Sequence, residues 1–259
     1  MRFKSVFMLM AGLLLMSSCQ DQPVHRKPVE KPAVILKDLM SFLKYRQQHV
    51  KLYETFNAVD SAQQTISRIQ FLKQLATGRY LPLRLQSPGQ PYYQLYPLEA
   101  KVEKDIKNTL KFWGEMEQAD AQAEGKPLPD FTFVDMQGNR YTNQNTKGKI
   151  VVVKCWFLGC LPCIQEMPAL NELKKMYENR KDILFVSPCW ESRSKVEAFL
   201  KKTKFDYAVA PDQYNYLTDQ LHLSGYPTHF VINKKGLISL RSNDYLAMAY
   251  VLNREAKQP

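Results

Sequence analysis

The pattern of apolar and polar residues predicts a small α+β domain over residues 33–125. Apolar residues recur at helical spacing in three stretches, and two strand patterns flank the turn Ser87–Gly89. We find no catalytic pattern in this part, and its tyrosines are interpreted as packing residues, with a binding surface as the alternative. The helical stretches contain Leu36, Leu39, Phe42 and Leu43, then Ile66, Ile69, Phe71, Leu72 and Leu75, then Val102, Ile106, Leu110 and Trp113, and the strands are Tyr80–Leu85 and Tyr92–Tyr96.

From residue 126 onward, strand and helix patterns alternate, and we place a second domain over residues 126–259. The apolar run Lys149–Val153 predicts a buried strand, and Ile164–Tyr177 predicts an amphipathic helix after it. Lys181–Ser187 and Ser194–Lys202 repeat this order. Hairpins are predicted at both ends of the domain, from Phe131–Asp135 to Tyr141, and from His229–Ile232 to Leu237–Leu240.

The first residues are typical of a bacterial secretory signal. Arg2 and Lys4 precede the apolar stretch 6–16, which is shorter than the roughly 20 residues that span a membrane. Residues 15–19 resemble a lipoprotein signal, so we predict a signal peptide over residues 1–18 and lipidation of Cys19. An ordinary cleaved signal with an incidental cysteine is the alternative. Residues 19–32 are polar and proline-containing, which predicts an extended tether.

Composition and charge narrow the classes of function. The 259 residues are 45% hydrophobic and 24% charged, which excludes a disordered or collagen-like chain. The net charge is +11, but residues 1–125 carry 17 basic and 12 acidic residues and residues 126–259 carry 19 and 13. Because this excess is spread along the chain, we interpret it as solvated helix faces and expect no nucleic-acid partner.

The candidate chemistry lies in the CxxC segment 160–163, between a predicted strand and a predicted helix. Two intervening residues let the sulfurs close a small disulfide ring, and a helix N-terminus favours a thiolate. We predict thiol–disulfide exchange, with Cys160 as nucleophile and Cys163 as resolving thiol. Zinc would need a second ligand pair, which His222 and His229 do not supply, and haem attachment would need His in place of Ile164. A structural disulfide is the remaining alternative.

Two motifs carry a resemblance to a known family. The first contains Trp156, the segment 160–163, Glu166 and Pro168, and the second is Tyr226–Thr228. Over roughly residues 126–244 the chain resembles the thioredoxin superfamily, and within it the TlpA/ResA-like extracytoplasmic thiol–disulfide oxidoreductases. The resemblance implies an α/β thioredoxin-like fold, a mixed central sheet flanked by helices, with no cofactor or metal. It also implies a cis Pro227 packed against the disulfide, and substrate binding by Trp156, Tyr226, Pro227 and Thr228.

The resemblance further implies that Glu166 tunes the cysteine pKa or moves a proton to the buried sulfur. The alternative is a carboxylate that only complements the helix dipole. Lys154 is unusual for the family at a buried strand position. We predict an ion pair with Glu166, with an ammonium group that reaches water as the alternative.

Three further residues have two interpretations each. We interpret Cys155 and Cys189 as buried free thiols, because cysteine packs as a small apolar residue. The alternative for Cys189 is a position at the mouth of the site, where it would exchange with Cys160. His229 belongs to a sheet face or lines the substrate groove.

Together these features predict a membrane-anchored, extracytoplasmic enzyme that reduces disulfides in protein substrates through its dithiol. An extracytoplasmic or membrane electron donor would restore the dithiol. The expected location is the bacterial cell envelope, facing the periplasm, with the outer membrane favoured because Gln20 follows Cys19. A redox sensor or binding module without efficient turnover is one alternative. A peroxide-reducing enzyme is another, but it predicts Thr and Arg beside Cys160, where neither occurs.

Overall fold

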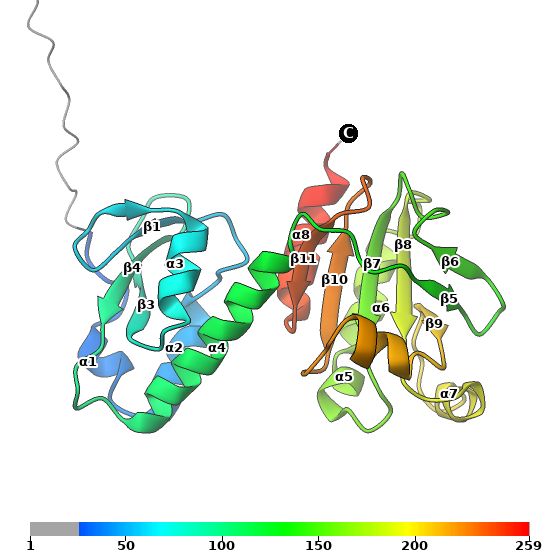
Figure 1. Ribbon diagram of the computed structural model, residues 1–259, viewed down its shortest axis with the longest axis horizontal. Coiled ribbons are helices and arrows are strands. Elements are labelled where there is room, and N and C mark those ends of the chain that lie inside the picture. Colours follow the sequence, from blue (N-terminus) through cyan, green and yellow to red (C-terminus); the bar gives the residue numbers. More distant parts are fainter. Residues whose placement is uncertain (1–25, 259) are drawn as a thin grey trace, which may run out of the picture.

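The computed structural model describes residues 26–258, which form two halves joined by one long helix (Figure 1). The N-terminal half contains helices α1 (Pro32–Ile35), α2 (Leu39–His49), α3 (Arg68–Leu75) and α4 (Lys104–Ala123), and strands β1 (Asn57–Val59), β2 (Thr65–Ile66), β3 (Tyr80–Leu85) and β4 (Tyr92–Pro97). The strands form one sheet in the order β2-β1-β4-β3, in which only β1 and β4 run parallel. The helices pack on this sheet around a core of their own.

The predicted strands coincide with β3 and β4, but the helical stripe around α3 was partly wrong. Ile66 belongs to β2, and Ile69 is 74% exposed, so the buried face of α3 consists of Phe71, Leu72 and Leu75. The helix starts one residue after Ser67, whose side chain accepts from the Gln70 N–H while the Gln70 side chain accepts from the Ser67 N–H. This reciprocal capping fixes the helix start, which hydrophobic spacing does not report.

The last residues of the predicted tether are not free. The Val29 N–H donates to the Arg84 carbonyl (3.0 Å), and the Gln86 N–H donates to the Lys27 carbonyl (2.8 Å). The outer edge of β3 offers unpaired backbone groups, and residues 27–29 satisfy two groups at this edge. The tether therefore ends near Arg26, and the predicted signal peptide and Cys19 lie outside the described residues.

The long helix α4 packs closely on α3. Gly114 lies at their crossing, where an added Cβ would come within 2.8 Å of the backbone of Leu75 and Ala76. The apolar face of α4, which carries Ile106, Leu110 and Trp113, points into the N-terminal core. Glycine is therefore required by close approach here, despite its low helix propensity.

The C-terminal half confirms the mixed sheet flanked by helices that the sequence predicted. Its strands are β7 (Ile150–Cys155), β8 (Ile183–Pro188), β9 (Ala208–Ala210), β10 (Thr228–Ile232) and β11 (Ile238–Ser242), with a hairpin of β5 (Thr132–Val134) and β6 (Arg140–Thr142) beside them. The sheet order is β11-β10-β7-β8-β9, in which β7, β8 and β9 are parallel and β10 and β11 antiparallel to their neighbours. The helical elements are α5 (Leu161–Gln165), α6 (Met167–Met176), α7 (Arg193–Leu200), the π-helical turn η1 (Tyr216–Gln220) and α8 (Tyr245–Ala256).

The predicted helix over residues 164–177 is in fact two helices. α5 ends and α6 begins at Glu166, because Pro168 lacks an N–H and its ring would clash with the carbonyl one turn earlier. The break leaves Glu166 between two helix axes. β9 and α8 were not predicted, the first because three residues give too short a pattern.

The two halves meet where α4 lies along β11. The Arg241 Nε lies 3.0 Å from Asp120 Oδ1, and the Gly125 N–H donates to the Ile238 carbonyl (2.8 Å). A cleft remains between the halves, and Arg46, Asp120 and Glu166 are among its lining residues. Within residues 26–258, no helix combines the length and the apolar character that a membrane crossing requires.

Candidate active site

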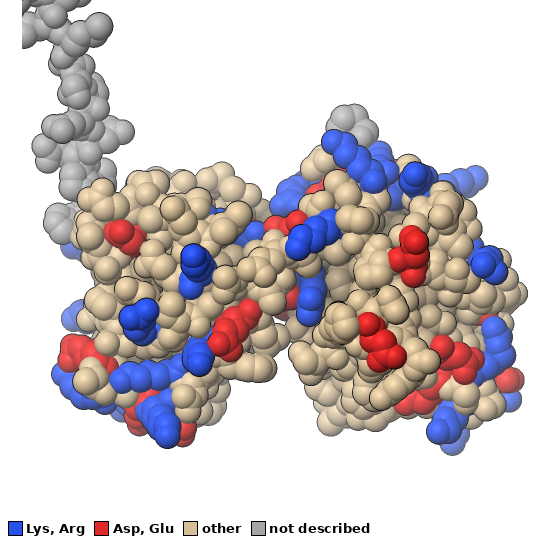
Figure 2. Space-filling view, viewed as in Figure 1, with Lys and Arg blue, Asp and Glu red and all other residues tan. Residues whose placement is uncertain are grey.

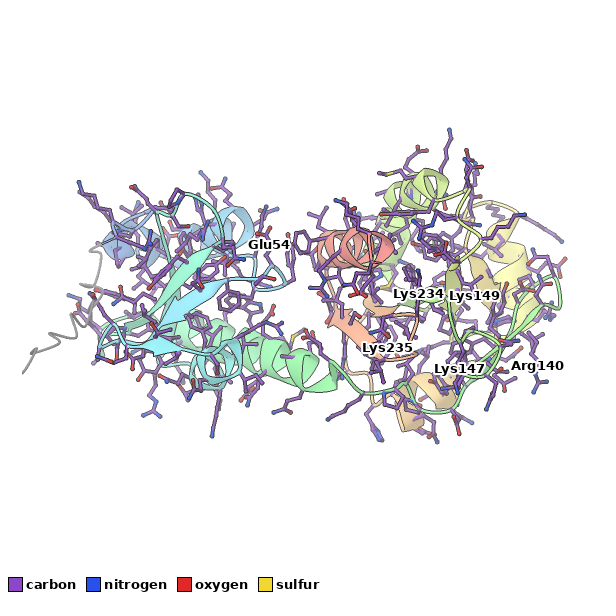
Figure 3. The ribbon with its side chains drawn as sticks, turned by 90° about the horizontal axis from the view of Figure 1, so that it is seen from above. Glu54, Arg140, Lys147, Lys149, Lys234 and Lys235 are labelled. Carbon is purple, nitrogen blue, oxygen red and sulfur yellow. A yellow bond between two sulfur atoms is a disulfide. The ribbon has the colours of Figure 1, made fainter. Side chains whose placement is uncertain are left out.

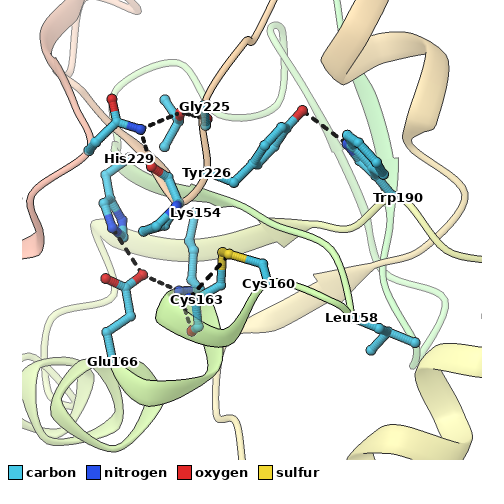
Figure 4. The surroundings of a disulfide bond; sticks show 12 residues. Lys154, Leu158, Cys160, Cys163, Glu166, Trp190, Gly225, Tyr226 and His229 are labelled. Atoms are coloured by element: carbon cyan, nitrogen blue, oxygen red, sulfur yellow. Dashed lines mark hydrogen bonds and ion pairs between the residues drawn. A yellow bond between two sulfur atoms is a disulfide. The ribbon is translucent and has the colours of Figure 1, made fainter.

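The two cysteines of the CxxC segment form a disulfide at the carboxyl end of β7 (Figure 4). Cys160 is the N-cap of α5, and its Sγ accepts a hydrogen bond from the Cys163 N–H (3.3 Å). Cys160 is 4% exposed, whereas Cys163 is fully buried. Only the first sulfur is therefore positioned to meet a molecule that arrives from solvent.

An uncharged groove lies beside Cys160. Its walls combine aromatic rings with loop backbone, and none of its lining residues carries a charge. The rings of Phe157 and Trp190 are stacked (4.7 Å between centroids), and both pack edge-on against Tyr226 (5.5 and 5.2 Å). Leu161 extends from the rim with 63% of its surface exposed. An apolar segment of another molecule can therefore lie against the sulfur.

The second motif forms the loop that closes this groove. The Tyr226–Pro227 peptide is cis, as predicted. The Thr228 hydroxyl donates to the Gly225 carbonyl (2.7 Å), and the Asn243 side chain donates to the Pro227 carbonyl. The Trp190 indole N–H donates to the Tyr226 hydroxyl (2.9 Å), and burial raises the pKa of that hydroxyl to about 12.

Lys154, Glu166 and His229 form a buried charged group behind the disulfide. The Lys154 ammonium is fully buried and donates to the Glu166 carboxylate and to the Cys163 carbonyl (2.9 Å). The His229 Nε2 lies 3.1 Å from the same Glu166 oxygen. The predicted ion pair between Lys154 and Glu166 is confirmed, and His229, which lies on strand β10, is a third member that the sequence did not indicate.

The environment of this group shifts two pKa values. Burial lowers the pKa of Lys154, although Glu166 opposes the shift. Burial disfavours a charged Glu166, but His229 and Lys154 outweigh that effect and hold its pKa below the ordinary value. Glu166 also lines the cleft between the two halves, whereas Cys160 lines the groove. The buried group therefore reaches solvent through Glu166, in a different hollow from the groove beside Cys160.

The side chains of two residues that the sequence assigned to substrate binding are buried. Trp156 is fully buried and packs against Phe199 and Phe205 (5.3 and 6.2 Å between centroids). Thr228 is buried, and its hydroxyl holds the loop rather than facing the groove. Among the aromatic residues of the two motifs, Tyr226 alone lines the groove.

The two free cysteines are buried, and burial raises the pKa of both thiols. Cys189 is fully buried and does not line the groove, and its thiol donates to the Glu191 carboxylate (3.2 Å). Glu191 also accepts from the Leu158 N–H (3.1 Å) and so holds the loop that leads to Cys160. Sequence reasoning missed Glu191 and Asn243, since neither belongs to a motif.

In residues 26–258, no three metal-ligating side chains lie close enough together to hold an ion.

The chain is similar to known proteins over its C-terminal half. The sequence model of the AhpC/TSA protein family matches residues 125–241. The thioredoxin-like protein YneN of Bacillus subtilis is 31% identical over 117 residues, which are 44% of this chain and 68% of that protein. The thiol-disulfide oxidoreductase ResA of Geobacillus kaustophilus is 28% identical over 116 residues, 45% of this chain and 67% of that protein. A solved thiol-disulfide oxidoreductase from Bacteroides fragilis has a TM-score of 0.45 and 18% identity, over 50% of this chain and 98% of that one.

Proposed function

The chain belongs to the thioredoxin-like thiol–disulfide oxidoreductases, and on that premise we propose that its Cys160–Cys163 dithiol reduces disulfide bonds in protein substrates. One observation carries the proposal. The sulfur of Cys160 lies at the rim of an uncharged groove, while its partner sulfur is buried beside a charged group. This asymmetry suits a nucleophile that meets substrate and a thiol that acts only afterwards.

The reaction starts from the reduced dithiol. The Cys160 thiolate attacks one sulfur of the substrate disulfide, which forms a mixed disulfide and releases the other substrate sulfur as a thiolate. The Cys163 thiolate then attacks Cys160 Sγ, which closes the Cys160–Cys163 disulfide and releases the second substrate thiol. The substrate gains two electrons and two protons, and the enzyme loses them. An electron donor must return them before the next turnover.

Glu166 is the proposed proton acceptor for the second step. Cys163 is fully buried, so its thiol cannot lose its proton directly to bulk water. Glu166 is ionised at neutral pH because His229 and Lys154 stabilise its carboxylate, and it lines the cleft. It can take the thiol proton and pass it to solvent there, while the Lys154 ammonium stabilises negative charge near Cys163.

The loop around Tyr226 is the proposed substrate platform. Tyr226 and Gly225 line the groove beside Cys160, and Asn243 and Thr228 hold the loop in place. Pro227 would set the direction of the backbone that meets an extended substrate segment. Aromatic walls favour substrate segments with apolar residues next to the cystine.

We further propose that the enzyme works outside the cytoplasm and is held to the envelope membrane, with the outer membrane favoured, by a lipid on Cys19. The apolar stretch 6–16 and the motif around Cys19 support this location. Residues 33–125 and 126–259 would be separate domains, since each half has its own core. The electron donor would be an extracytoplasmic or membrane protein, and no nucleic acid would take part.

Trapping the mixed disulfide tests this function. Cys163→Ser is expected to accumulate a covalent adduct with a protein disulfide substrate, whereas Cys160→Ser forms none. The reduction potential, measured against a dithiol buffer, is expected between about −200 and −270 mV, the range from glutaredoxins to thioredoxin. If the dithiol and disulfide did not interconvert reversibly, the redox sensor or binding module would be the remaining function. If the protein reduced hydrogen peroxide but not protein disulfides, it would be a peroxide-reducing enzyme.

A further inference from the structure

Five basic residues gather at one end of the C-terminal half. We call them the basic pole: Arg140, Lys147, Lys149, Lys234 and Lys235 (Figure 3). They come from the start of β6 and from the turns before β7 and β11, which the fold brings together. The Gly148 N–H donates to the Lys234 carbonyl (3.0 Å), and the Asn145 side chain donates to the Arg140 carbonyl (2.8 Å).

The basic pole has little compensating charge. Among the described residues, no ion pair forms with Arg140, Lys147, Lys149 or Lys235. Asp182 lies 3.7 Å from the Lys234 ammonium, but it is held by two hydrogen bonds from Arg180 (2.7 and 2.8 Å). Basic side chains gather at this end of the half in the space-filling view as well (Figure 2). Part of the excess charge that looked dispersed in the sequence, the part carried by residues 126–259, is concentrated here.

The basic pole and the dithiol lie at opposite ends of the same strand. Lys149 immediately precedes β7, and Cys160 follows its carboxyl end. The six residues of β7 span about 20 Å at ~3.3 Å each. In Figure 1 the turns before β7 and β8 lie at the upper edge of this half, and α5 lies at its lower edge. A surface bound to the pole therefore leaves the groove at Cys160 open.

We propose that the basic pole docks on an anionic phospholipid surface and holds the dithiol pointing away from it. The proposal rests on the membrane-anchored location proposed above. Six residues lie between Cys19 and Arg26, so the seven steps from one Cα to the next reach at most about 25 Å, after which the chain is fixed to β3. A protein held that close to a bilayer must present some face to it, and a face on which unpaired positive charges gather is attracted to anionic lipid.

Lipid suits this surface better than nucleic acid does. Tyr141, the aromatic residue next to Arg140, packs against the core of this half and donates its hydroxyl to the Asp135 carboxylate (3.1 Å), so its ring is not free to stack on a base. The four lysines lie on the turns before β7 and β11, and Arg140 begins β6, so their ammonium and guanidinium groups can face a flat plane of phosphates. Each basic residue near an anionic surface strengthens binding about fivefold, and salt screens the effect within about 8–10 Å.

The test uses a chain that starts at Gln20, which keeps every described residue and lacks the lipid. Cosedimentation measures its binding to vesicles of one part phosphatidylglycerol and two parts phosphatidylcholine, with phosphatidylcholine alone as control. Lys147→Gln with Lys235→Gln is expected to weaken binding about 25-fold. The matched variant, Lys195→Gln with Lys202→Gln, removes the same charge from α7 and the residues after it, and is expected to change binding less than twofold.

Equal losses in both double variants, or equal binding to both vesicle types, would overturn the proposal. Tighter binding of a mixed-sequence DNA duplex than of the anionic vesicles would make the pole a nucleic-acid surface instead. On the vesicle, a soluble dithiol is expected to reduce the Cys160–Cys163 disulfide at the same rate as in solution, and a tenfold slower rate would refute the orientation. Reduction of a soluble protein disulfide without vesicles tests the proposed function separately, and neither double variant is expected to alter it.

Discussion

Replacing Lys154 with methionine is expected to destabilise the oxidised protein by about 3 kcal/mol. The Lys154 ammonium is fully buried and donates to the Glu166 carboxylate and the Cys163 carbonyl. Removing one partner of a buried ion pair costs about 3–5 kcal/mol, because the other charge stays buried without compensation. The lower end applies here, since Glu166 keeps His229 at 3.1 Å and is 10% exposed to the cleft.

A double-mutant cycle separates this explanation from a simple loss of packing. Glu166→Leu alone is also expected to cost about 3 kcal/mol, since it leaves the ammonium unpaired. The two changes together are expected to cost only about 1–2 kcal/mol. The apolar side chains fill similar volumes, and the main remaining loss is the hydrogen bond to the Cys163 carbonyl.

Urea unfolding at pH 7 measures the cycle, and about 3 kcal/mol corresponds to a fall in Tm of about 6–12 °C. The pKa of Glu166 is lowered from its ordinary value of 4.5, so its stabilising effect is present above pH 4.5 and is lost as the pH falls through the lower, folded-state pKa. In the variants that lack Glu166, the free energy of unfolding is therefore expected to fall less between pH 4.5 and lower pH than it does in the unmodified protein. A double variant as unstable as the sum of the single variants would refute the reasoning, because additivity means no coupling.

Three other predictions concern sites away from this pair. Gly114→Ala is expected to destabilise the protein by about 1–2 kcal/mol in thermal melts, because a Cβ 2.8 Å from the Leu75 backbone outweighs the gain of about 1 kcal/mol in helix propensity; a stabilised variant would contradict the close approach. In the reduced protein, Cys155 and Cys189 are expected to react with an alkylating reagent only after unfolding, since burial raises both pKa values, and mass spectrometry of the folded protein would expose any early adduct on Cys189. Burial raises the pKa of Asp120 to about 7, so the folded state binds its proton more tightly and stability falls as the pH rises from about 4 to about 7. Asp120→Asn is expected to make Tm fall less steeply over this pH range. An unchanged slope would mean that another group causes the pH dependence.

The redox centre could be predicted from sequence because its residues are close together in the chain. The spacing of Cys160 and Cys163 determines which sulfurs can meet, and the preceding strand pattern fixes their place at the end of a sheet. Glu166 was predicted as a partner for Lys154, and the structure places the two in contact. The contact with His229 depends on which strand pairs with β7, and local pattern contains no such information.

Long-range features were the ones that sequence reasoning missed. Glu191 and Asn243 hold two loops of the site through contacts that no motif marks. Trp156 was predicted to contact substrate because it belongs to a motif, but its motif did not indicate that the side chain is fully buried. The basic pole could not be predicted from the sequence, because its residues are spread over almost a hundred positions, from Arg140 to Lys235. They become neighbours only after β10 and β11 form.

The contact of α4 with β11 has a consequence for folding during synthesis. β11 is an outer strand of the five-stranded sheet, and such strands pair readily with strands of other molecules when they are uncovered. α4 and the backbone at Gly125 and Lys126 lie against it, and all of them precede β11 in the chain. During synthesis, the N-terminal half can fold first and is already present when β11 leaves the ribosome. The N-terminal half therefore covers the edge of β11 and prevents self-association there. Residues 126–259 made alone are expected to aggregate through β11.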